Sequence, residues 1–392
     1  MKPSLETDSD LVASRPGAAV GALSRHPFHA HERPMGPHYC VYNRRFMVVC
    51  FDSRSVEDGY WLLRQRVGLL HTGELPLEIK GPDAETLLNR LFTRDVSKLK
   101  TGRCGYGLAC YEDGGLLVDG ILMRLAPDRF WYVQADGDFY GWARAHAIGM
   151  DVEISDPGVY VSQVQGPNAL KLLDAMSDGG LPAGFGYYGI ATVRLGGQSF
   201  VITRTGFTNE LGWEFYTEPH HDVDALWALF QTHGAPLGLD MAPVDAFNIR
   251  RIEAGILNAG SDFNRYTTPY DVGLGRFVDE DTDFIGRPAL RAAPKARRLY
   301  GFKCFGGEVA ITGAVERDGA RVGSVCAEAV SPLLGQSIGY VLLDSPEMSA
   351  ARPVQIGCRD GSLQAAELLV PPFYDRTGAI PRGKQIDIPV RP

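Results

Sequence analysis

A repeated segment constrains the fold of this chain more than any other feature. The stretches LEIKGPDAETLLNRLF (77–92) and VSQVQGPNALKLLDAM (161–176) share a strand-like run, a Gly-Pro turn and an amphipathic helix. Their turn glycines, Gly81 and Gly166, lie 85 residues apart. Proline near a first helical turn is well placed, because its missing N–H needs no partner there. Two copies of one unit predict a pseudo-symmetric α+β region over residues 39–290. A chance match in a common motif is the alternative.

The segments on either side of this region differ from it in composition. Residues 1–38 mix Ser, Pro, Gly, His and charged residues without periodicity, which predicts a flexible N-terminal arm. The stretch 287–298 is basic and rich in Pro and Ala, as linkers often are. After it, short strand-like runs alternate with turns, and this spacing predicts a small all-β domain within residues 291–392.

Three segments of the middle region carry clear secondary-structure signals. Residues 38–51 have the composition of a strand. Residues 55–70 begin with serine and two acidic residues before an apolar-periodic stretch, which predicts a capped helix. A further helix is expected from residue 248 to a stop near Gly260, with a polar loop after it.

Composition and charge exclude several kinds of partner. Hydrophobic residues make up 45% of the chain and charged residues 22%, which is ordinary for a globular protein. The formal net charge is −8 without a dense Lys/Arg stripe, which argues against nucleic acid or an anionic membrane surface. We find neither a signal-peptide pattern nor a run of about 18 apolar residues. Seven cysteines without a Cys-x-x-Cys pair favour a reduced, cytoplasmic protein.

Several motifs point away from common chemistries. GFGYYG at 184–189 matches a dinucleotide fingerprint, but a strand-like run follows it where a helix is required. The close histidines His26, His29 and His31 lie in the predicted arm without a Cys or Asp to complete a metal site, so we expect solvated side chains. A P-loop and a Gly-x-Ser-x-Gly elbow are both missing from the sequence, which argues against phosphoryl transfer and serine hydrolysis.

Two carboxylates need an explanation. In YEDGGLLVDGILMRL (111–125), Asp119 lies in the middle of a strand-like apolar run. An unpaired buried carboxylate costs several kcal/mol or becomes neutral, so Asp119 is either functional or held by a turn or an ion pair. In RTGFTNELGWEFY (204–216), Glu214 precedes an aromatic strand-like end. From the pattern alone, Glu214 is either a site residue or the solvent face of a hairpin.

Taken together, the motifs resemble the aminomethyltransferase family, which comprises the glycine-cleavage T-protein and tetrahydrofolate-dependent demethylases. The resemblance covers nearly the whole chain from about residue 40. It rests on the ordered segments IKGPDAETLLNRLFTRDVSKLKTGRCGYG, GGLLVDGIL, VQGP, RTGFTNELGWEFY, RIEAGILNAGSDF, TTPYDVGLG, DFIGRPAL and SPLLGQSIGYVLL. It implies an α+β fold of three domains in a cloverleaf around a folate-binding hole, with residues 39–290 binding folate and a small β-barrel-like C-terminal domain.

The resemblance also implies site residues. Asp119 matches the second, functional aspartate of the T-protein motif and is the predicted catalytic residue. Four residues match folate contacts: Tyr106, Ile121, Phe207 and Glu214. Phe207 stands where T-protein has tyrosine, so ring stacking is kept and a hydroxyl contact is lost. Further candidates for substrate binding are His71, Trp131 and Gln165. No metal site is predicted.

Three departures from the T-protein pattern argue against aminomethyl transfer. Val118 replaces the first aspartate of the motif, Leu70 replaces the aspartate of an Asp-x-Ser element, and Phe247 stands at the position of an active-site arginine. We therefore expect a tetrahydrofolate-dependent demethylase that moves a methyl group from a small S-methyl or O-methyl donor to N5 of tetrahydrofolate. The product is 5-methyl-tetrahydrofolate, and no lipoyl carrier protein is expected.

The donor stays open at this point. NIRRIEAGILNAGSDF resembles the dimethylsulfoniopropionate demethylase branch, whereas Asp119-Gly120-Ile121 and DFIGRPAL resemble aryl-methyl-ether demethylases. A sulfonium leaves as a neutral thioether and favours an aromatic or acidic surrounding, whereas a methoxy-aromatic acid needs a proton donor such as His71 or a tyrosine. An N-methyl donor, the glycine-cleavage aminomethyltransferase reaction and a non-catalytic folate-binding role also stay open. The chain is expected to be a monomer or homodimer.

Overall fold

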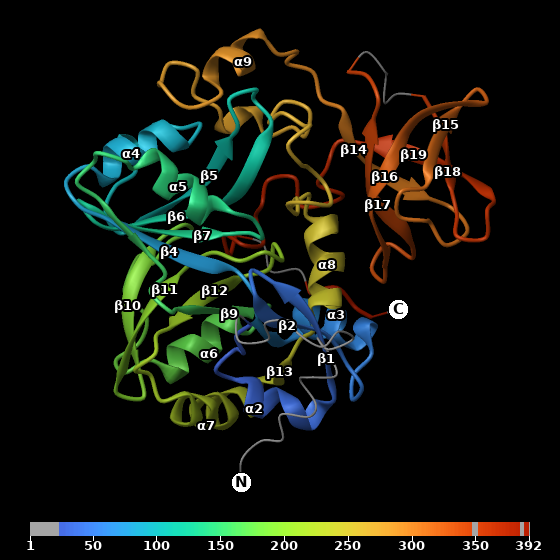
Figure 1. Ribbon diagram of the computed structural model, residues 1–392. Helices are drawn as coiled ribbons and strands as arrows, with labels where there is room; N and C mark the ends of the chain where they lie inside the picture. The colour runs from blue at the N-terminus through green and yellow to red at the C-terminus, as the bar shows by residue number, and fades with distance from the viewer. Residues whose placement is uncertain (1–22, 347–351, 385–387, 392) are drawn as a thin grey trace, which may run out of the picture.

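The two repeated units build two sheets with the same strand order (Figure 1). The computed structural model describes residues 23–346, 352–384 and 388–391 of the 392-residue chain. The first unit consists of β4 (Leu75–Lys80), α4 (Ala84–Leu91), β5 (Arg103–Cys110), β6 (Leu116–Ala126) and β7 (Arg129–Gln134). The second consists of β9 (Tyr160–Gln165), α6 (Ala169–Met176), β10 (Ile190–Leu195), β11 (Gln198–Thr203) and β12 (Gly212–Thr217). The orders β5-β6-β7-β4 and β10-β11-β12-β9 confirm the predicted repeat.

The two sheets exchange a strand. β8 (Glu153–Ser155), which precedes the second unit, pairs with β4 of the first unit. β3 (Val67–His71), which precedes the first unit, pairs with β9 of the second. The strand β13 (Leu239–Met241) then adds to β3 in parallel and completes the six-stranded sheet. Because each sheet contains a strand that belongs to the other unit along the chain, the two units form one body.

The turn glycines of the repeat are required by close backbone contacts. Gly81 has φ of 132° and Gly166 has φ of 131°, a conformation that side chains disfavour. A Cβ atom at Gly81 would lie 2.6 Å from the Asp151 carbonyl oxygen, and one at Gly166 would lie 2.6 Å from the Arg66 carbonyl oxygen. Each strand can therefore turn into its helix only with glycine at this point.

Four layers are stacked in this region (Figure 1). The inner faces of the two sheets meet around buried residues that include Met123, Trp131, Val161 and Tyr216. Helices α4 and α5 (Phe139–His146) cover the outer face of the five-stranded sheet. Helices α6 and α7 (Val223–Gly234) cover the outer face of the six-stranded sheet. Apolar burial on both faces of each sheet holds these layers together.

Two helices at the centre of the molecule end earlier than the sequence predicts. α3 (Val56–Gln65) begins as expected, with Ser55 Oγ accepting the Asp58 backbone N–H at 3.0 Å. It stops at Gln65 because residues 67–71 are recruited as β3 beside β9. α8 (Val244–Glu253) stops near Gly255, whose φ is 74°, and not near Gly260. α8 packs against α3 and the barrel strands β16 and β17.

The arm prediction is wrong for the part that the structure describes. We call residues 23–36 the N-terminal strap; it contains α2 (His29–Glu32) and the 3₁₀ turn η2 (Arg33–Met35). Phe28 of the strap is fully buried, and its ring stacks on His71 at 4.6 Å. His26 is also buried, so the expectation of solvated histidines fails for this residue. Burial of these rings fixes the strap, while residues 1–22 lie outside the described residues.

A hairpin follows the strap where a single strand was predicted. Its strands are β1 (Pro37–Tyr42) and β2 (Arg45–Phe51), joined by Asn43 and Arg44. Both turn residues have positive φ, 49° and 59°, as a tight two-residue hairpin turn requires. The other 3₁₀ turns within the described residues are η3 (Val96–Lys98), η4 (Ala235–Leu237) and η5 (Gly275–Phe277).

The C-terminal region forms the predicted β domain as a closed barrel. The segment with linker character contains α9 (Arg287–Ala292), and the barrel follows it (Figure 1). Its strands run in the order β14-β17-β16-β15-β18-β19, and alternate residues such as Phe302 and Val341 fill its interior. The strands are β14 (Leu299–Cys304), β15 (Ala314–Arg317), β16 (Ala320–Ser331), β17 (Gln336–Leu343), β18 (Val354–Gly357) and β19 (Leu363–Leu369).

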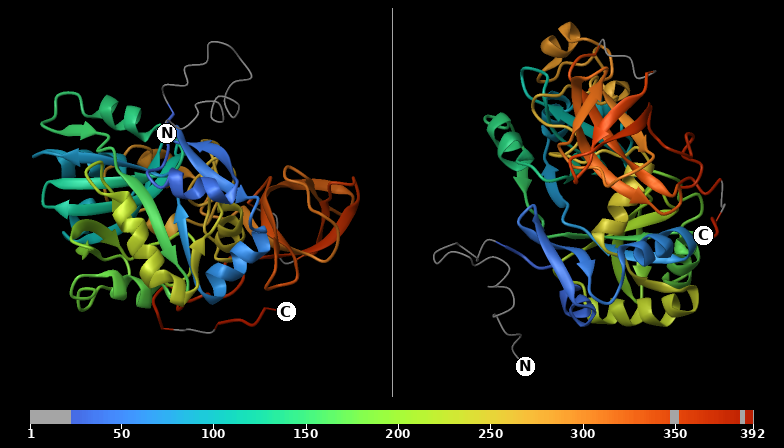
Figure 2. Two further views of the ribbon diagram at one scale, coloured as in Figure 1. Left: turned by 90° about the horizontal axis from the view of Figure 1, so that it is seen from below. Right: turned by 90° about the vertical axis from the view of Figure 1, so that its right-hand side faces the viewer.

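The end of the chain returns from the barrel to α3 (Figure 2). Arg391 donates to Asp58 Oδ1 at 2.8 Å, and Gln65 Nε2 donates to the Pro389 carbonyl at 3.0 Å. The fold as a whole is the expected three-lobed α+β arrangement, with α8 at its centre. No helix within the described residues is both long and apolar enough to cross a membrane.

Candidate active site

Asp119 lies on β6, and the fold buries its carboxylate. The residue is only 6% exposed and sits across from Leu108 on β5. The Tyr106 hydroxyl, two residues earlier on β5, donates a hydrogen bond of 2.5 Å to Asp119 Oδ2. This hydrogen bond replaces part of the lost hydration, so a carboxylate is tolerated in the apolar run.

Packing explains why glycine follows Asp119. A Cβ atom at Gly120 would lie 2.3 Å from the Val133 carbonyl oxygen and 2.9 Å from the Tyr132 ring, both on β7. Only glycine lets β7 approach β6 this closely. The Ala135 backbone N–H then donates to the Asp119 carbonyl at 3.2 Å. The Asp-Gly pair is therefore held rigidly by its neighbouring strand.

Burial shifts the acidity of Asp119. It raises the pKa of the Asp119 carboxyl to about 6, and the Tyr106 hydrogen bond opposes this only in part. The carboxylates of Asp262 and Glu74 raise the same pKa further. Asp262 forms an ion pair with Arg251, whereas Glu74 Oε2 is buried and has no hydrogen-bond partner in the described part of the chain. Glu74 is therefore the neighbouring carboxylate that acts on Asp119 while its own Oε2 atom lacks a partner among the described residues.

Glu214 is the second buried carboxylate, and it lies on the facing sheet. It belongs to β12 and is 6% exposed. Its Oε2 atom accepts hydrogen bonds from Thr205 Oγ1 at 2.6 Å, the Tyr216 hydroxyl at 3.2 Å and Thr203 Oγ1 at 3.4 Å. Burial nevertheless raises the pKa of Glu214 to about 7. A solvent-facing hairpin position for Glu214, the alternative left open by the pattern, is therefore wrong.

The inner faces of the two sheets bring these groups together. On the five-stranded sheet, Ile121 pairs with Tyr106 and with Val133, two residues along β6 from Asp119. On the six-stranded sheet, Glu214 pairs with Gln163 on β9 and with Thr203 on β11. Both faces border the same apolar layer.

Glu214 is close enough to the opposite sheet to influence the Cys104 thiol, which lies on β5 two residues from Tyr106. Burial raises the pKa of this thiol, and the charge of Glu214 raises it further. Glu214 and Tyr106 therefore lie on two surfaces that face one another.

Phe207 and Phe247 add an aromatic pair beside this group. Phe207 precedes β12, and its backbone N–H donates to Gln163 Oε1 at 3.2 Å. Its ring stacks on Phe247 of α8 with centroids 5.3 Å apart. Both rings and Tyr106 belong to, or pack against, the same apolar cluster around α8. The replacement of the family arginine by Phe247 thus puts a ring where the T-protein pattern has a charge.

Of the three predicted substrate-binding residues, His71 lies on a different face from this group, and all three make contacts within the fold. His71 is on the outer face of the six-stranded sheet, where its ring stacks on His26 at 4.3 Å and its Nδ1 lies 2.8 Å from Ser162 Oγ. Burial lowers the pKa of His71 to about 3. Trp131 is buried between the sheets and donates to Glu78 Oε1 at 3.2 Å.

The side chain of Gln165 is used within the fold. Its Oε1 accepts from Thr208 Oγ1 at 2.7 Å, and its Nε2 donates to the Thr205 carbonyl at 3.3 Å. It thus holds the 205–208 loop. Gln163, two residues earlier on β9, was missed by sequence reasoning. It is fully buried, and its Nε2 atom has no hydrogen-bond partner within the described residues. Strand alternation places both glutamines on one face, but it does not show which amide is free.

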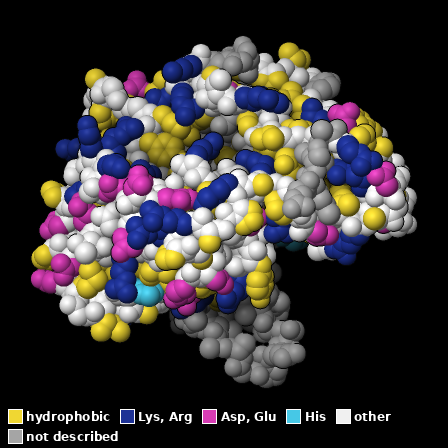
Figure 3. Space-filling view, turned by 90° about the horizontal axis from the view of Figure 1, so that it is seen from above, with side chains coloured by type: hydrophobic (Ala, Val, Ile, Leu, Met, Phe, Trp, Pro, Cys, Tyr) yellow, Lys and Arg dark blue, Asp and Glu magenta, His cyan; other side chains and the backbone are white. Residues whose placement is uncertain are grey.

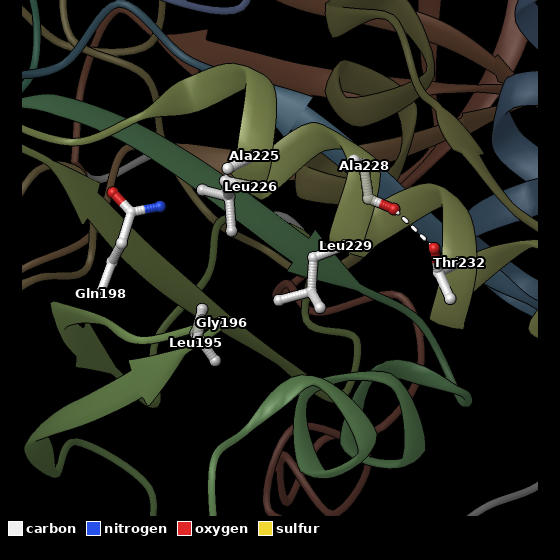
Figure 4. A pocket seen from close by; sticks show the side chains of 8 residues that line it. All are labelled: Leu195, Gly196, Gln198, Ala225, Leu226, Ala228, Leu229 and Thr232. Carbon is white, nitrogen blue, oxygen red and sulfur yellow. Dashed lines mark hydrogen bonds between the residues drawn. The ribbon is translucent and has the colours of Figure 1, made fainter.

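The surface above the molecule is hollowed between its lobes, with hydrophobic side chains around the hollow and Lys and Arg side chains near it (Figure 3). A separate pocket of about 250 Å³ lies against α7, on the outer side of the six-stranded sheet (Figure 4). There the Thr232 hydroxyl donates to the Ala228 carbonyl at 2.9 Å. This pocket contains no titratable side chain, and it is apart from Asp119 and Glu214. Within the described residues no group of His, Cys, Asp and Glu is arranged to hold a metal ion.

Comparison with known proteins identifies the class. The model of the GCVT N-terminal domain matches residues 35–282, and the model of the glycine cleavage T-protein C-terminal barrel domain matches residues 297–375. The chain therefore belongs to the glycine cleavage T-protein, or aminomethyltransferase, family. The chemistry of this family is folate-dependent transfer of methyl or aminomethyl groups.

Individual relatives differ in their reactions. The chain is 31% identical to trimethylamine-oxide aldolase of Ruegeria pomeroyi over 96% of its own length, but it spans only 50% of that relative. It is 30% identical to the dimethylsulfoniopropionate demethylase DmdA of the same organism, covering 86% of this chain and 94% of the relative. It is 33% identical to the aminomethyltransferase of Rubrobacter xylanophilus, covering 93% and 98%. Sequence identity alone therefore does not indicate which of these reactions the chain catalyses.

A solved structure shows the same fold. The aminomethyltransferase T of the glycine cleavage system from Bartonella henselae matches with a TM-score of 0.80 at 23% sequence identity. The match covers 90% of this chain and 99% of that one. The fold is thus the T-protein fold, with the predicted small barrel at its C-terminal end.

Proposed function

We propose that this chain is a tetrahydrofolate-dependent methyltransferase that demethylates a small S-methyl donor and forms 5-methyl-tetrahydrofolate. The observation that carries the proposal is the pair of buried carboxylates, Asp119 and Glu214, on facing sheet surfaces beside the Tyr106 and Phe207 rings. A carboxylate binds N–H groups of a heterocycle through charge-assisted hydrogen bonds. A second carboxylate offsets positive charge that develops during methyl transfer.

The residues present fit the pterin part of tetrahydrofolate. Glu214 is an acceptor for N–H groups, and Tyr106 and Phe207 offer ring faces. The Gln163 amide offers a buried N–H that is unpaired within the described residues. Tetrahydrofolate supplies N5 as the methyl acceptor.

Asp119 is the residue proposed to act near the acceptor nitrogen. Its place on a strand locked by Gly120 and Tyr106 keeps the carboxylate in one orientation. A fixed charge needs no reorganisation during the reaction, so it stabilises the transition state more than a mobile charge would. Alignment of donor and acceptor supplies the rest of the rate, because reacting atoms held about 3–3.5 Å apart have a large effective concentration.

The charges around Asp119 favour a cationic donor. Asp119 itself and Glu74, whose Oε2 atom has no hydrogen-bond partner among the described residues, are carboxylates that attract a positively charged sulfonium, whereas Asp262 is neutralised by Arg251. A sulfonium leaves as a neutral thioether and needs no general acid, and the proton released from the acceptor nitrogen passes to solvent. A methoxy-aromatic donor needs one. His71, the candidate acid, lies on the other face of the sheet, and the Tyr106 hydroxyl is engaged by Asp119.

Two of the three departures from the T-protein pattern support demethylation over aminomethyl transfer. Val118 is fully buried in the layer under α4 and α5, and Leu70 is buried beside α3 and α8. Phe247 stacks on Phe207. Leu70 and Phe247 are apolar and packed around α8, so neither offers a charge to an aminomethyl group on a carrier arm. Val118 lies on the side of β6 that faces away from Asp119, so its replacement does not alter the charge at the candidate site. The absence of a lipoyl carrier protein, a monomeric or homodimeric state and a cytoplasmic location stay predictions.

The test is a donor panel with purified protein and tetrahydrofolate. Dimethylsulfoniopropionate, a methoxy-aromatic acid and an N-methyl amine are supplied separately, and 5-methyl-tetrahydrofolate is measured by chromatography. Turnover with the sulfonium alone supports the proposal. Formation of 5,10-methylene-tetrahydrofolate from an aminomethyl carrier would instead restore the T-protein reaction. Tight folate binding without turnover on any donor would favour a non-catalytic role.

A further inference from the structure

Glu214 and Gln163 form a neighbouring acceptor and donor that nothing else in the described structure uses. They are directly paired across β12 and β9, which places their Cβ atoms about 4.5–5.5 Å apart on one face. All three hydroxyl donors to Glu214 bind its Oε2 atom. No donor among the described residues reaches Oε1. Gln163 Nε2 likewise has no partner among them, although the residue is fully buried.

The orientation of the Gln163 amide is set by the fold. Its Oε1 atom accepts the Phe207 backbone N–H at 3.2 Å. Because a backbone N–H needs an oxygen acceptor, the amide nitrogen points away from Phe207. A buried amide N–H without a partner costs free energy, about 1–3 kcal/mol for a neutral group. A ligand that supplies the missing acceptor recovers that free energy on binding.

We propose that Glu214 and Gln163 together bind a cyclic lactam edge, which is an N–H group beside a carbonyl oxygen. Glu214 Oε1 accepts the lactam N–H, and Gln163 Nε2 donates to the carbonyl oxygen. In the pterin ring this edge is N3–H with O4. The inference rests on the proposed function, and it makes Gln163 a specificity-determining residue that distinguishes 4-oxo from 4-amino pteridines.

The test compares two ligands that differ at position 4. Folic acid has the 4-oxo group and N3–H, and aminopterin has a 4-amino group and a bare N3. Affinities are measured by calorimetry, without methyl donor, at pH 8, because burial raises the pKa of Glu214 to about 7. The two ligands also differ at N3, which contacts Glu214, and this difference affects the wild-type protein and the Gln163 variants alike. Comparing the ratio of the two affinities between wild-type protein and a Gln163 variant therefore isolates the effect of position 4, as in a double-mutant cycle.

Two substitutions keep the test interpretable. Gln163→Met removes the donor, and Gln163→Glu replaces the donor with an acceptor while keeping an oxygen for the Phe207 N–H. We expect wild-type protein to prefer folic acid. We expect the ratio of affinities for the two ligands to fall about tenfold in Gln163→Met, the effect of one buried hydrogen bond. In Gln163→Glu the preference shifts further towards aminopterin. Gln198→Met, at the start of β11, is the matched control and leaves both affinities unchanged.

The outcomes separate this inference from the proposed function. If both ligands weaken equally in Gln163→Met and Gln163→Glu, Gln163 only supports the Phe207 loop and the inference is overturned. If wild-type protein binds neither ligand, the folate-binding function itself fails. Binding with the expected change of preference but without turnover upholds the lactam contact and rejects only the methyl transfer.

Discussion

Burial makes Asp119 and Glu214 weaker acids than free carboxyl groups, and this gives the proposed reaction a defined pH dependence. Burial raises the pKa of Asp119 to about 6 and that of Glu214 to about 7. In both cases hydrogen-bond donors lower the pKa, but burial outweighs them. A ligand that donates to either carboxylate therefore competes with a proton for the same site.

Substitution of Asp119 tests its role at the reacting atoms. Asp119→Asn keeps the shape and is expected to lower kcat by about 10²–10³, the usual effect of removing one group that stabilises a transition state. Wild-type kcat should rise with pH through about 6, because only the ionised carboxylate is active. Tyr106→Phe removes the opposing hydrogen bond and moves this midpoint to higher pH. Asp128→Asn, on the exposed β6–β7 turn, is the control, and an unchanged kcat in Asp119→Asn would contradict the assignment.

Folate binding should release a proton from Glu214. The neutral carboxyl must ionise before it accepts N–H donors, so the dissociation constant rises about tenfold for each pH unit below 7. Glu214→Gln is expected to weaken binding and to remove this dependence. Calorimetry in buffers of different ionisation enthalpy measures the proton release directly. A dissociation constant that is flat between pH 5 and pH 8 would show that another group binds the ligand.

At the scale of elements, the N-terminal strap packs on the six-stranded sheet through buried histidine rings. His26 stacks on His71, and Phe28 stacks on the same ring. Ser162 Oγ lies 2.8 Å from His71 Nδ1 and 3.3 Å from His26 Nε2. Burial lowers the pKa of both histidines, that of His71 to about 3. His29, Arg45 and His31 are the other basic groups that act on this pair.

This arrangement predicts loss of stability in acid. Both folded-state pKa values lie below the unfolded value near 6.5, so the unfolded chain binds more protons as the pH falls. Above about pH 6.5 the two histidines therefore do not lower the free energy of unfolding. Below that pH the free energy of unfolding decreases. Each histidine contributes a slope of about 1.4 kcal/mol per pH unit. His71→Gln removes one of the two protonation sites. It should therefore reduce the slope of the free energy of unfolding against pH, between pH 6 and pH 5, by about 1.4 kcal/mol per pH unit. Urea unfolding measures this slope. The exposed His220→Gln serves as control, and an unchanged slope in His71→Gln would reject this explanation.

At the scale of the whole molecule, one buried carboxylate joins the lobes. Glu253 of α8 accepts hydrogen bonds from Tyr60 of α3 at 3.0 Å, Ser331 of the barrel at 2.5 Å and Tyr374 of the C-terminal segment at 2.7 Å. It also pairs with Arg250, which shares Glu210 with Arg64. The two arginines and two glutamates balance in charge, and Glu253 and Arg250 are completely buried. This network therefore fixes the barrel against the two-sheet region.

Loss of Glu253 should destabilise the molecule far more than loss of one partner. Glu253→Gln leaves Arg250 without one of its carboxylates and is expected to lower the free energy of unfolding by about 3–5 kcal/mol. Ser331→Ala removes a single donor and should cost about 1 kcal/mol. Denaturant unfolding followed by tryptophan fluorescence measures both. Similar, small effects of the two substitutions would show that the barrel is held by its apolar contacts alone.

Local patterns in the sequence predicted much of this architecture. The Gly-Pro repeat predicted two equivalent units because both segments share one strand, turn and helix pattern. The structure adds that neighbouring backbone leaves no room for a Cβ atom at either turn glycine. Alternating runs predicted the C-terminal β domain, and Ser55 predicted the start of α3. Helix ends were predicted poorly. Residues 67–71 became a strand only because β9 offers an edge to pair with, and no local signal carries that information.

The candidate site was predicted in part. Asp119 stood out because a charge in an apolar run demands a compensating partner, and the family resemblance pointed to Tyr106, Ile121, Phe207 and Glu214. The structure brings these residues to facing surfaces. His71 could not be placed from its identity, because strand register decides which face a side chain occupies. Gln163 was missed because it shares a face with Gln165, and only the hydrogen bonds of the structure show which of the two amides lacks a partner among the described residues.

The sequence by itself determined where the two repeated strand–turn–helix units, the start of α3 and the C-terminal strands lie, and it marked Asp119 as a charge that needs a compensating partner. Those features depend on residues close together along the chain. Only the tertiary structure decided that β3 and β8 exchange sheets, that Glu214 faces Tyr106, that the strap is buried and that the Gln163 amide is left without a partner among the described residues. These outcomes depend on contacts between residues far apart in the chain, whose register and burial are settled only when the whole core packs.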